Sequence, residues 1–539
     1  METIGRRSLI VGAAAAVAAL RLKGAAMPLP VPGRQARLVD DPFTLGLATG
    51  DPTSSGFVAW TRLAPDPTAG GGMAPDPVAV SYEVASDAGF AQVVRTGEVT
   101  AIGDLAHTVH LDVGGLDPAS EWWVRFTAEG FDSPVARART LPDGGTPPLR
   151  FGFVSCQRYP NGYYTALRGL AEEDCDLWLH LGDYIYETPG TGPVRSHGDS
   201  EAVTLNDYRN RYGTYKSDLD LQAAHHSAPV VPVWDDHEVD NDYADEVGEN
   251  DQTPAEIRAR RTAGYRAWFE HQPVRLTAPT GPDLQIYRRF AWGDLATFHM
   301  LDDRQYRDPP PCGGELAECP ERLSGDRSML GTEQRSWLAD GLAGSGAVWD
   351  VVGQQVVFVP LPFGPLYNNA QWDGYPQERE LVWDLLKTRP NPVIVTGDIH
   401  AAGVARLHED LDDVDTPRIG TELVGTSVSS TFNPALVDAA EALISSLPYI
   451  EYVNAGQRGY TIVDLTAEHM RAEYKVVDQV TSPGGTISSA YVLELDARAA
   501  TEVPIGDPGT PPGDPGTPPG GPGGPGTPGG PGGPGTPGG

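Results

Sequence analysis

Four apolar segments that each run into a polar turn constrain the fold of this chain more than any other feature of its sequence. From Leu149 onward, the segments RFGFVSC, DLWLHLGDYIYE, VPVWDDHEVDND and NPVIVTGDIHA have the β-prone character of buried strands. Stretches with helical spacing, such as NGYYTALRGLAEEDC, lie between them. Strands that alternate with helices predict an α/β layered fold, in which functional sites lie at the carboxyl ends of the strands.

Side chains of the types that bind metal ions follow each of these four predicted strands. In chain order they include Cys156, Asp183, Tyr186, Asp236, His237, Asp398 and His400. A dinuclear hydrolase needs such a set, because two cations share a bridging carboxylate, activate a water and hold phosphoryl oxygens. One such strand end would be a weak signal, but four in one chain favour a metal-dependent hydrolase. Asp398 and His400 are two residues apart, so we expect their side chains to point the same way.

An all-β region precedes the α/β part. Between about residues 42 and 142, short alternating stretches such as GFVAWTRL, VAVSYEVAS and EWWVRFTAE are separated by turn clusters. This pattern predicts a β-sandwich of the immunoglobulin or fibronectin kind. We expect it to be a scaffold that packs on the enzyme and has no chemistry of its own.

Neither end of the chain has the pattern of a folded domain. Residues 1–26 contain Arg6 and Arg7, a short apolar run and small residues, which is typical of a twin-arginine signal peptide. We therefore expect export by the twin-arginine machinery, no transmembrane anchor in the mature protein, and a secreted, periplasmic or wall-associated location. Residues 501–539 are almost entirely Pro, Gly, Thr and Asp, and we expect a disordered tail because such a segment buries too little apolar surface to fold.

Charge and cysteine content narrow the possibilities further. The formal net charge of −34 repels nucleic acid, so no stable nucleic-acid partner is expected, and any phosphate site must be locally positive. Cys312 and Cys319 flank a short polar loop and are predicted to form a disulfide in an oxidising compartment, with two free thiols as the alternative.

Several motifs together resemble the PhoD-like alkaline phosphatases, the alkaline phosphatase D family. They are GLATGDPTSSGFVAWTR, VSCQ, GDYIYE, WDDHEVDNDYA, LDDRQYR, MLG, WDGY and TGDIH. The resemblance covers about residues 42–495, with the β-sandwich over 42–142 and a catalytic domain over 149–495. It implies a calcineurin-like metallophosphoesterase β-sandwich flanked by helices, and a site that holds Fe³⁺ and Ca²⁺.

The resemblance also implies roles for individual residues. Cys156, Asp183, Tyr186 and His400 would bind iron, with Asp183 bridging to the second metal, and Asp398 would hold calcium. The alternatives are that Cys156 is a buried structural cysteine and that Tyr186 is an aromatic wall residue.

The third strand end leaves its ligands open. Asp236 occupies the position where many metallophosphoesterases have an asparagine ligand, but Asp235, Asp240 or Asn241 could replace it. His237 would protonate the leaving alkoxide or hold phosphate.

Basic side chains outside the strand ends are weaker candidates. Arg211 and Lys216 could bind substrate phosphate, although charges on a surface helix explain them at least as well. Asp302 and Arg304 are expected to form a structural ion pair near the site.

These observations predict an exported phosphoesterase that hydrolyses phosphomonoesters or phosphodiesters by direct attack of a metal-bound hydroxide, for phosphate scavenging. One alternative is a selective phosphodiesterase or phospholipase-like enzyme that acts on lipid head groups or teichoic-acid-type polymers. A second is a non-enzymatic surface protein for adhesion, which would have no use for ligands at all four strand ends.

Overall fold

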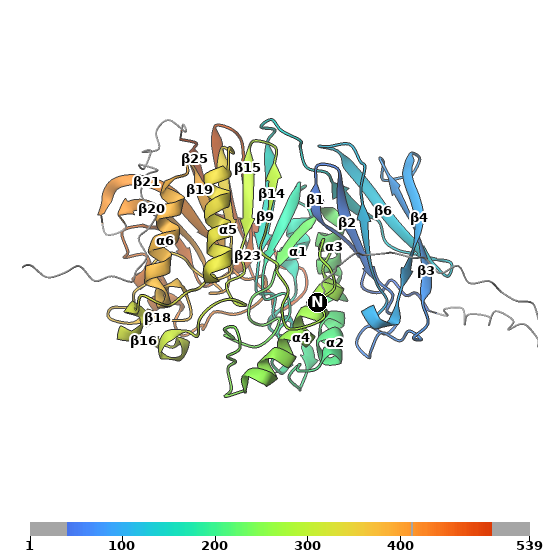
Figure 1. The fold of residues 1–539 in the computed structure, drawn as a ribbon, viewed down its shortest axis with the longest axis horizontal. Helices are drawn as coiled ribbons and strands as arrows, with labels where there is room; N and C mark the ends of the chain where they lie inside the picture. The colour runs from blue at the N-terminus through green and yellow to red at the C-terminus, as the bar shows by residue number, and fades with distance from the viewer. Residues whose placement is uncertain (1–39, 411–412, 499–539) are drawn as a thin grey trace, which may run out of the picture. The chain divides into compact units, whose positions relative to one another are not determined.

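The computed structural model describes residues 40–410 and 413–498, so the predicted signal peptide and Pro/Gly tail lie outside the described residues. Two β-sheets form the centre of this part of the chain (Figure 1). The larger has nine strands in the order β25 (Ile487–Asp496), β24 (His469–Val477), β23 (Arg458–Leu465), β9 (Leu149–Val154), β10 (Leu177–Leu181), β13 (Val230–Val233), β1 (Leu47–Thr53), β2 (Gly56–Arg62) and β5 (Thr108–Val113). The other has seven, in the order β14 (Arg288–Trp292), β15 (Ala296–Met300), β17 (Trp349–Gly353), β19 (Pro392–Thr396), β21 (Asp413–Val424), β20 (Ala402–Asp410) and β22 (Ile450–Asn454).

The strands that carry the predicted site are the buried, parallel strands of these sheets. β9, β10 and β13 pair in parallel within the larger sheet, and β19 pairs in parallel with β17 and β21 in the other. Strands covered on both faces need a continuous apolar sequence, which these segments have. Phe151 and Phe298, one from each sheet, meet edge to face with ring centroids 5.3 Å apart and join the sheets in one core. The predicted α/β fold is confirmed.

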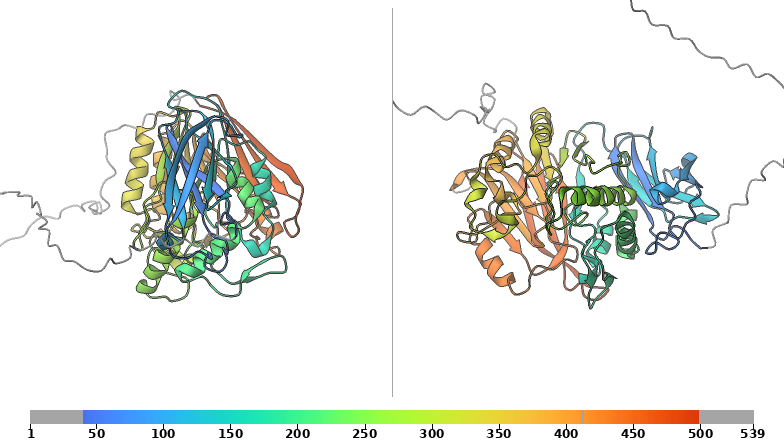
Figure 2. Two further views of the ribbon diagram at one scale, coloured as in Figure 1. Left: turned by 90° about the vertical axis from the view of Figure 1, so that its right-hand side faces the viewer. Right: turned by 60° about the horizontal axis from the view of Figure 1, so that its bottom comes forward.

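Helices lie on both outer sides of the strands (Figure 2). Apolar side chains of α1 (Thr165–Ala171) and α3 (Leu219–Ser227) pack on the larger sheet, and those of α5 (Gly331–Gly344) and α6 (Pro376–Lys387) on the smaller. The remaining α-helices are α2 (Leu205–Lys216), α4 (Pro254–His271) and α7 (Val437–Ile444). Helices α2 and α4 each begin at a threonine capping box, which satisfies backbone N–H groups of the first turn. Within the described ranges, no helix combines the length and apolar character that crossing a membrane requires.

The N-terminal β region is joined to the catalytic part through a shared sheet. The strands β3 (Val78–Ala85), β4 (Val93–Ala101), β6 (Glu121–Ala128), β7 (Phe131–Asp132) and β8 (Ala136–Arg139) form a separate sheet. However, β1, β2 and β5 continue the nine-stranded sheet, because Gly50 of β1 pairs in parallel with Val230 of β13. A Cβ atom on Gly50 would lie 2.6 Å from the Val230 carbonyl oxygen, so this junction requires glycine. The sequence predicts a scaffold packed on the enzyme, whereas the structure has three of its strands inside the enzyme's sheet.

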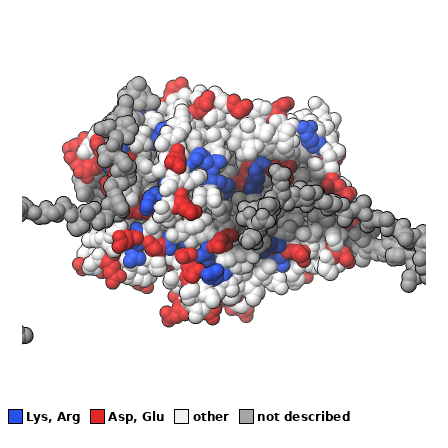
Figure 3. Space-filling model, viewed as in Figure 1, with Lys and Arg blue, Asp and Glu red and all other residues white. Residues whose placement is uncertain are grey.

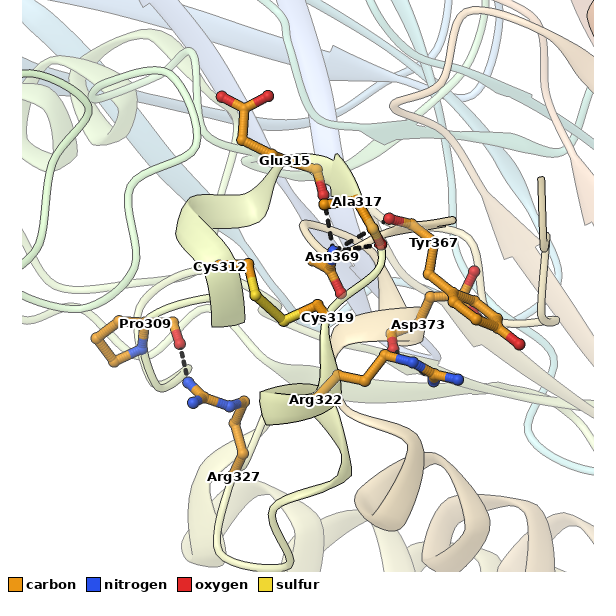
Figure 4. Close-up of a disulfide and its surroundings, with 10 residues drawn as sticks. All are labelled: Pro309, Cys312, Glu315, Ala317, Cys319, Arg322, Arg327, Tyr367, Asn369 and Asp373. Carbon is orange, nitrogen blue, oxygen red and sulfur yellow. Dashed lines mark hydrogen bonds between the residues drawn. A yellow bond between two sulfur atoms is a disulfide. The ribbon is translucent and has the colours of Figure 1, made fainter. Parts of the chain in front are cut away.

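A disulfide closes the loop between Cys312 and Cys319, as predicted (Figure 4). Within that loop, β16 (Leu316–Ala317) pairs with β18 (Tyr367–Asn368). The amide of Asn369 donates to the carbonyl oxygens of Glu315 and Tyr367 at 2.8 and 3.1 Å. The disulfide loop is therefore attached to the segment 367–373, which contributes to the site described below.

The excess of Asp and Glu over Lys and Arg in the sequence predicts a predominantly acidic surface. Figure 3 shows acidic side chains scattered over one face, with a smaller group of Lys and Arg near its middle. An anionic substrate must therefore be attracted by local groups and not by the field of the whole protein.

Candidate metal centre

The four strand ends meet between the two sheets. The backbone N–H of Cys156, after β9, donates to the carbonyl oxygen of Gly182, after β10. A Cβ on Gly182 would lie 2.4 Å from Cβ of Asp235, which follows β13. A Cβ on Gly397, after β19, would lie 2.6 Å from the hydroxyl of Ser155. Glycine before each aspartate in GDYIYE and TGDIH therefore allows the strand ends to approach this closely.

Four of the predicted ligands have left-handed backbone conformations, with φ of 59° at Cys156, 57° at Asp183, 63° at Asp398 and 58° at His400. Such conformations cost roughly 1–3 kcal/mol each in non-glycine residues and cluster at functional sites. They turn the chain sharply after β9, β10 and β19, so that these side chains project into the space between the strand ends.

Three groups of potential metal ligands result, and within each group the ligand atoms lie within 4.8 Å of one another. They are Cys156 with Asp183 and His400, Asp183 with Asp236 and His237, and Asp235 with Asp236 and Asp398. Asp183 and Asp236 each belong to two groups, which is the arrangement that neighbouring cations sharing carboxylates require. His400 and Asp398 belong to different groups, and both lie in turns with positive φ, where the strand alternation behind the expectation that they point the same way does not apply.

Tyr186 contacts the first of these groups. Its hydroxyl donates to Oδ2 of Asp183 at 2.7 Å and lies 3.1 Å from Nε2 of His400. The hydroxyl of Ser430 donates to it at 2.7 Å. Ser430 follows β21 and has no recognisable pattern in the sequence, so sequence analysis missed it.

The electrostatics of the cluster fit bound cations. One oxygen each of Asp183, Asp235 and Asp236 is buried without a hydrogen-bond partner among the described residues. Burial and neighbouring carboxylates raise the pKa of Asp183 and Asp235 well above their ordinary values. Burial also raises the pKa of the Cys156 thiol well above its usual range. A bound cation would stabilise these anionic forms, and thiolate, carboxylate, phenolate and imidazole are donors for iron and other transition metals, while carboxylates suit calcium.

Arg304 is the main internal counter-charge. Its fully buried guanidinium forms an ion pair with Asp235 and another, at 3.0 Å, with Asp398. Contrary to the expectation from sequence, the guanidinium does not pair with Asp302. Only the backbone N–H of Arg304 donates to that carboxylate, at 3.1 Å. Burial opposes ionisation of Asp236, but Arg304 and then His237 outweigh it and lower the pKa of Asp236.

His237 is oriented by Glu187, the last residue of the GDYIYE motif. Nδ1 of His237 lies 2.7 Å from a carboxylate oxygen of the fully buried Glu187. The ring also packs against that of Tyr186, tilted by 35°, with centroids 4.1 Å apart. Burial lowers the pKa of His237, but Glu187 and then Asp183 and Asp236 raise it well above the ordinary value. Sequence analysis assigned Glu187 no role, although its motif was singled out.

A polar cavity of about 280 Å³ opens onto this cluster. Its lining includes Tyr186, His237, Asn241, His400 and Arg158. The guanidinium of Arg158 donates to the Pro189 carbonyl oxygen at 3.3 Å and to the Thr188 hydroxyl at 3.4 Å, and it pairs with no carboxylate of residues 40–410 and 413–498. Arg158 is therefore the cation that can meet an anionic ligand here, and sequence analysis missed it although it directly follows the VSCQ motif.

The basic residues that sequence analysis considered lie elsewhere. The buried guanidinium of Arg211 donates to the carbonyl oxygens of Tyr186, Thr188 (3.1 Å) and Ser200 (2.9 Å). Lys216 is also buried, where its ammonium donates to the hydroxyl of Tyr184 at 3.0 Å. Neither residue lines the polar cavity, because each is used to hold α2 against the core.

The structure also distinguishes between the alternative ligands at the third strand end. Asp240 pairs with Arg260 at 2.8 Å and belongs to none of the three ligand groups. Asn241 lines the polar cavity, where its amide donates to Glu249 at 3.0 Å.

Comparisons with known proteins cover the whole site. The family model described as PhoD-like phosphatase matches residues 151–474, and that described as PhoD-like phosphatase, N-terminal domain, matches residues 28–142. Alkaline phosphatase D from Bacillus subtilis (strain 168) is 43% identical over 481 residues, covering 86% of this chain and 82% of that protein. A solved structure of PhoD matches with a TM-score of 0.82 at 41% identity, covering 87% of this chain and 92% of that one.

Proposed function

The chain belongs to the PhoD-like phosphatase family, and we propose that it is an exported, metal-dependent phosphoesterase that cleaves phosphomonoesters and phosphodiesters by direct attack of water on phosphorus. Membership of the family makes the chain a phosphatase. The observation that best supports metal dependence is the convergence of Cys156, Asp183, Asp236, Asp398 and His400 into ligand groups that share carboxylates.

The donor types support a different ion at each end of the cluster. We assign Fe³⁺ to Cys156, Asp183, Tyr186 and His400, because anionic sulfur and oxygen donors with an imidazole suit iron. We assign Ca²⁺ to the carboxylate-rich end at Asp183, Asp236 and Asp398, with Asn241 as a further oxygen donor, because calcium takes oxygen ligands. When bound, such ions would lower the pKa of a water and neutralise charge on phosphoryl oxygens.

The chain's own side chains then bind the substrate and move a proton. Arg158 would donate to the phosphoryl oxygens in the polar cavity, since it is the unpaired cation there. His237, held by Glu187 through Nδ1, would present Nε2 to the leaving oxygen and protonate it. This pathway has no covalent phosphoenzyme, so the configuration at phosphorus should invert.

Metal content and activity test this proposal together. We expect the purified protein to contain iron and calcium and to hydrolyse simple phosphate esters. The Cys156→Ala variant should lose iron and activity while its circular dichroism stays unchanged. A protein that is active without either metal, or a chiral phosphate product with net retention, would contradict it.

The export route is proposed from the sequence alone. Arg6 and Arg7 precede the apolar run of residues 9–20. Replacing both by lysine should leave the enzyme in the cytoplasm, whereas unchanged export would refute the twin-arginine assignment.

A further inference from the structure

A second cavity adjoins the candidate metal centre and shares His400 with the polar cavity. It has a volume of about 260 Å³, and both Asp398 and His400 line it. His400 also lines the polar cavity that holds Arg158 and His237. The two cavities therefore flank one candidate metal ligand, and a substrate bound at the cluster can extend into either.

The lining of this second cavity is mainly apolar. Nine of its fourteen lining residues are hydrophobic, among them Val357, Val359, Phe363 and Phe432. Val357 and Val359 are fully buried, whereas Phe363 and Phe432 are partly exposed. A mostly apolar pocket with a few converging polar groups is typical of sites that bind the hydrophobic part of a small molecule.

Charge separates the roles of the two cavities. No Lys or Arg lines the apolar cavity within the described part of the chain, and its carboxylates Asp373 and Asp398 are paired with Arg379 and Arg304, so its lining offers phosphate no free cationic side chain. The polar cavity contains Arg158, which attracts phosphate. The phosphoryl group and an apolar substituent would thus be sorted to different cavities that share His400.

The wall of the apolar cavity is fixed by hydrogen bonds to the metal centre. The amide of Gln371 donates to Oδ2 of Asp398 at 2.7 Å, and its oxygen accepts from the backbone N–H of Val357 at 2.7 Å. Asp373 accepts from the backbone N–H of Leu361 at 3.0 Å. The cavity is therefore preformed next to the cluster, because the same side chains order both.

We propose that this apolar cavity binds the hydrocarbon part of the ester alcohol, so that the enzyme prefers phosphate esters of apolar alcohols over esters of small or polar ones. The inference rests on the proposed phosphoesterase function and assigns its substrate class. Phe363 and Phe432 are the specificity-determining residues, since they are the two phenylalanine side chains of the lining and both are partly exposed.

Straight-chain alkyl phosphates test this preference, because their leaving alcohols have similar reactivity and differ mainly in length. For the full-length metal-loaded enzyme, kcat/KM should rise from methyl to butyl to hexyl phosphate by up to about fourfold per methylene, the equivalent of about 0.8 kcal/mol for each buried CH₂. The Kd values of the matching alkyl phosphonates, measured by calorimetry, should fall in the same order.

Matched variants distinguish this cavity from its neighbours. Phe363→Ser and Phe432→Ser should flatten the dependence on chain length of both kcat/KM and the phosphonate Kd. Val194→Ala is the control, because Val194 lines a different cavity beside Arg158. A length dependence that is absent from the wild type, kept in both serine variants, or lost in Val194→Ala would overturn the proposal.

The outcomes also separate this inference from the proposed function. Hydrolysis of methyl phosphate without any length dependence would leave the phosphoesterase standing and refute the cavity assignment. Absence of all hydrolysis would refute the function, while the phosphonate affinities would still decide whether the cavity binds alkyl chains.

Discussion

The hydroxyl of Tyr186 donates a 2.7 Å hydrogen bond to Oδ2 of Asp183. The aromatic residue of one short motif and the carboxylate that we propose to bridge the metals are thus in contact across a backbone turn with φ of 57° at Asp183. Because Nε2 of His400 lies 3.1 Å from the same hydroxyl, three potential ligands surround one point. A phenol in this position can bind a trivalent ion once its proton is lost, whereas an aromatic wall residue would not need its hydroxyl there.

Removing the hydroxyl of Tyr186 should remove the colour of the protein. A phenolate bound to ferric iron gives a visible charge-transfer band, so the wild type should absorb visible light and Tyr186→Phe should lose or strongly shift that band. Visible absorption spectra of both proteins test this, and elemental analysis of the same samples gives their iron content. A Tyr184→Phe variant is the control, because the Tyr184 hydroxyl instead contacts Lys216 and His225. An unchanged spectrum in Tyr186→Phe would exclude phenolate ligation.

Local sequence pattern predicted the strands and the polar residues at their ends, because hydrophobic runs and their endpoints are short-range features. It could not predict which ligands share a group. Asp398 and His400 belong to different groups, and their turns have positive φ, a conformation that sequence periodicity does not report. Arg304, which lies 94 residues from Asp398 and 69 from Asp235 along the chain, could not be placed between them by any local pattern.

Basic residues illustrate the same limit. Arg211 and Lys216 lie on a polar helix and look accessible in the sequence, but both are buried. Arg158 lies in an unremarkable turn, yet lines the polar cavity. Burial depends on what packs over a residue from distant parts of the chain, so sequence alone could not rank these cations.

Arg158→Ala should weaken substrate binding without unfolding the protein. A hydrogen bond to a charged group contributes about 1.5–3 kcal/mol, so KM should rise roughly 10- to 100-fold, and Arg158→Lys should lose less. Steady-state kinetics with a simple monoester measure this. The control is Arg258→Ala, which removes an exposed arginine paired with Glu246. Equal kinetics for the Arg158 and Arg258 variants would show that Arg158 does not bind phosphate.

Glu187→Gln should slow the cleavage of esters whose leaving group needs a proton. The amide can still accept from the backbone N–H of Asn241, but it no longer fixes His237 with a charged partner. Loss of such an orienting partner typically costs 10- to 100-fold, so we expect kcat for alkyl phosphates to fall by about that factor with little change in KM. Esters of p-nitrophenol need no protonation and should be nearly unaffected. An equal loss for both leaving groups would indicate a structural role only.

Breaking the disulfide should destabilise the loop beside the apolar cavity. For a sequence separation of 7 residues, loop-closure entropy predicts a loss of about 2–3 kcal/mol in the free energy of unfolding for the double variant Cys312→Ser with Cys319→Ser. Reductant should lower the stability of the wild type to the same level and leave the double variant unchanged. If reductant did not change the free energy of unfolding of the wild type, the predicted contribution of the Cys312–Cys319 disulfide would be contradicted.

Acid should destabilise the fold through histidines that are buried in the neutral form. The ring of His271 is fixed as neutral by its partners: Nδ1 donates to the Ala267 carbonyl oxygen at 2.6 Å, and Nε2 accepts from Arg62 at 2.8 Å. Burial, and then the charge of Arg62, hold the pKa of His271 well below its ordinary value. Burial likewise lowers the pKa of His180 to about 3.

Because the folded pKa is depressed, the stability from each histidine is present above the unfolded pKa of about 6.5 and is lost as pH falls below it. Each site should contribute a slope of up to about 1.4 kcal/mol per pH unit to the free energy of unfolding, measured by denaturant titration from pH 7.5 to 4.5. In His271→Gln the amide oxygen can still accept from Arg62. This variant should reduce the total slope by the contribution of one protonation site, up to about 1.4 kcal/mol per pH unit. Tyr212→Phe alters the ring stacked on His271 but leaves the histidine in place, so it should shift stability without changing the slope. If the His271→Gln variant kept the full slope, His271 would not be buried in its neutral form.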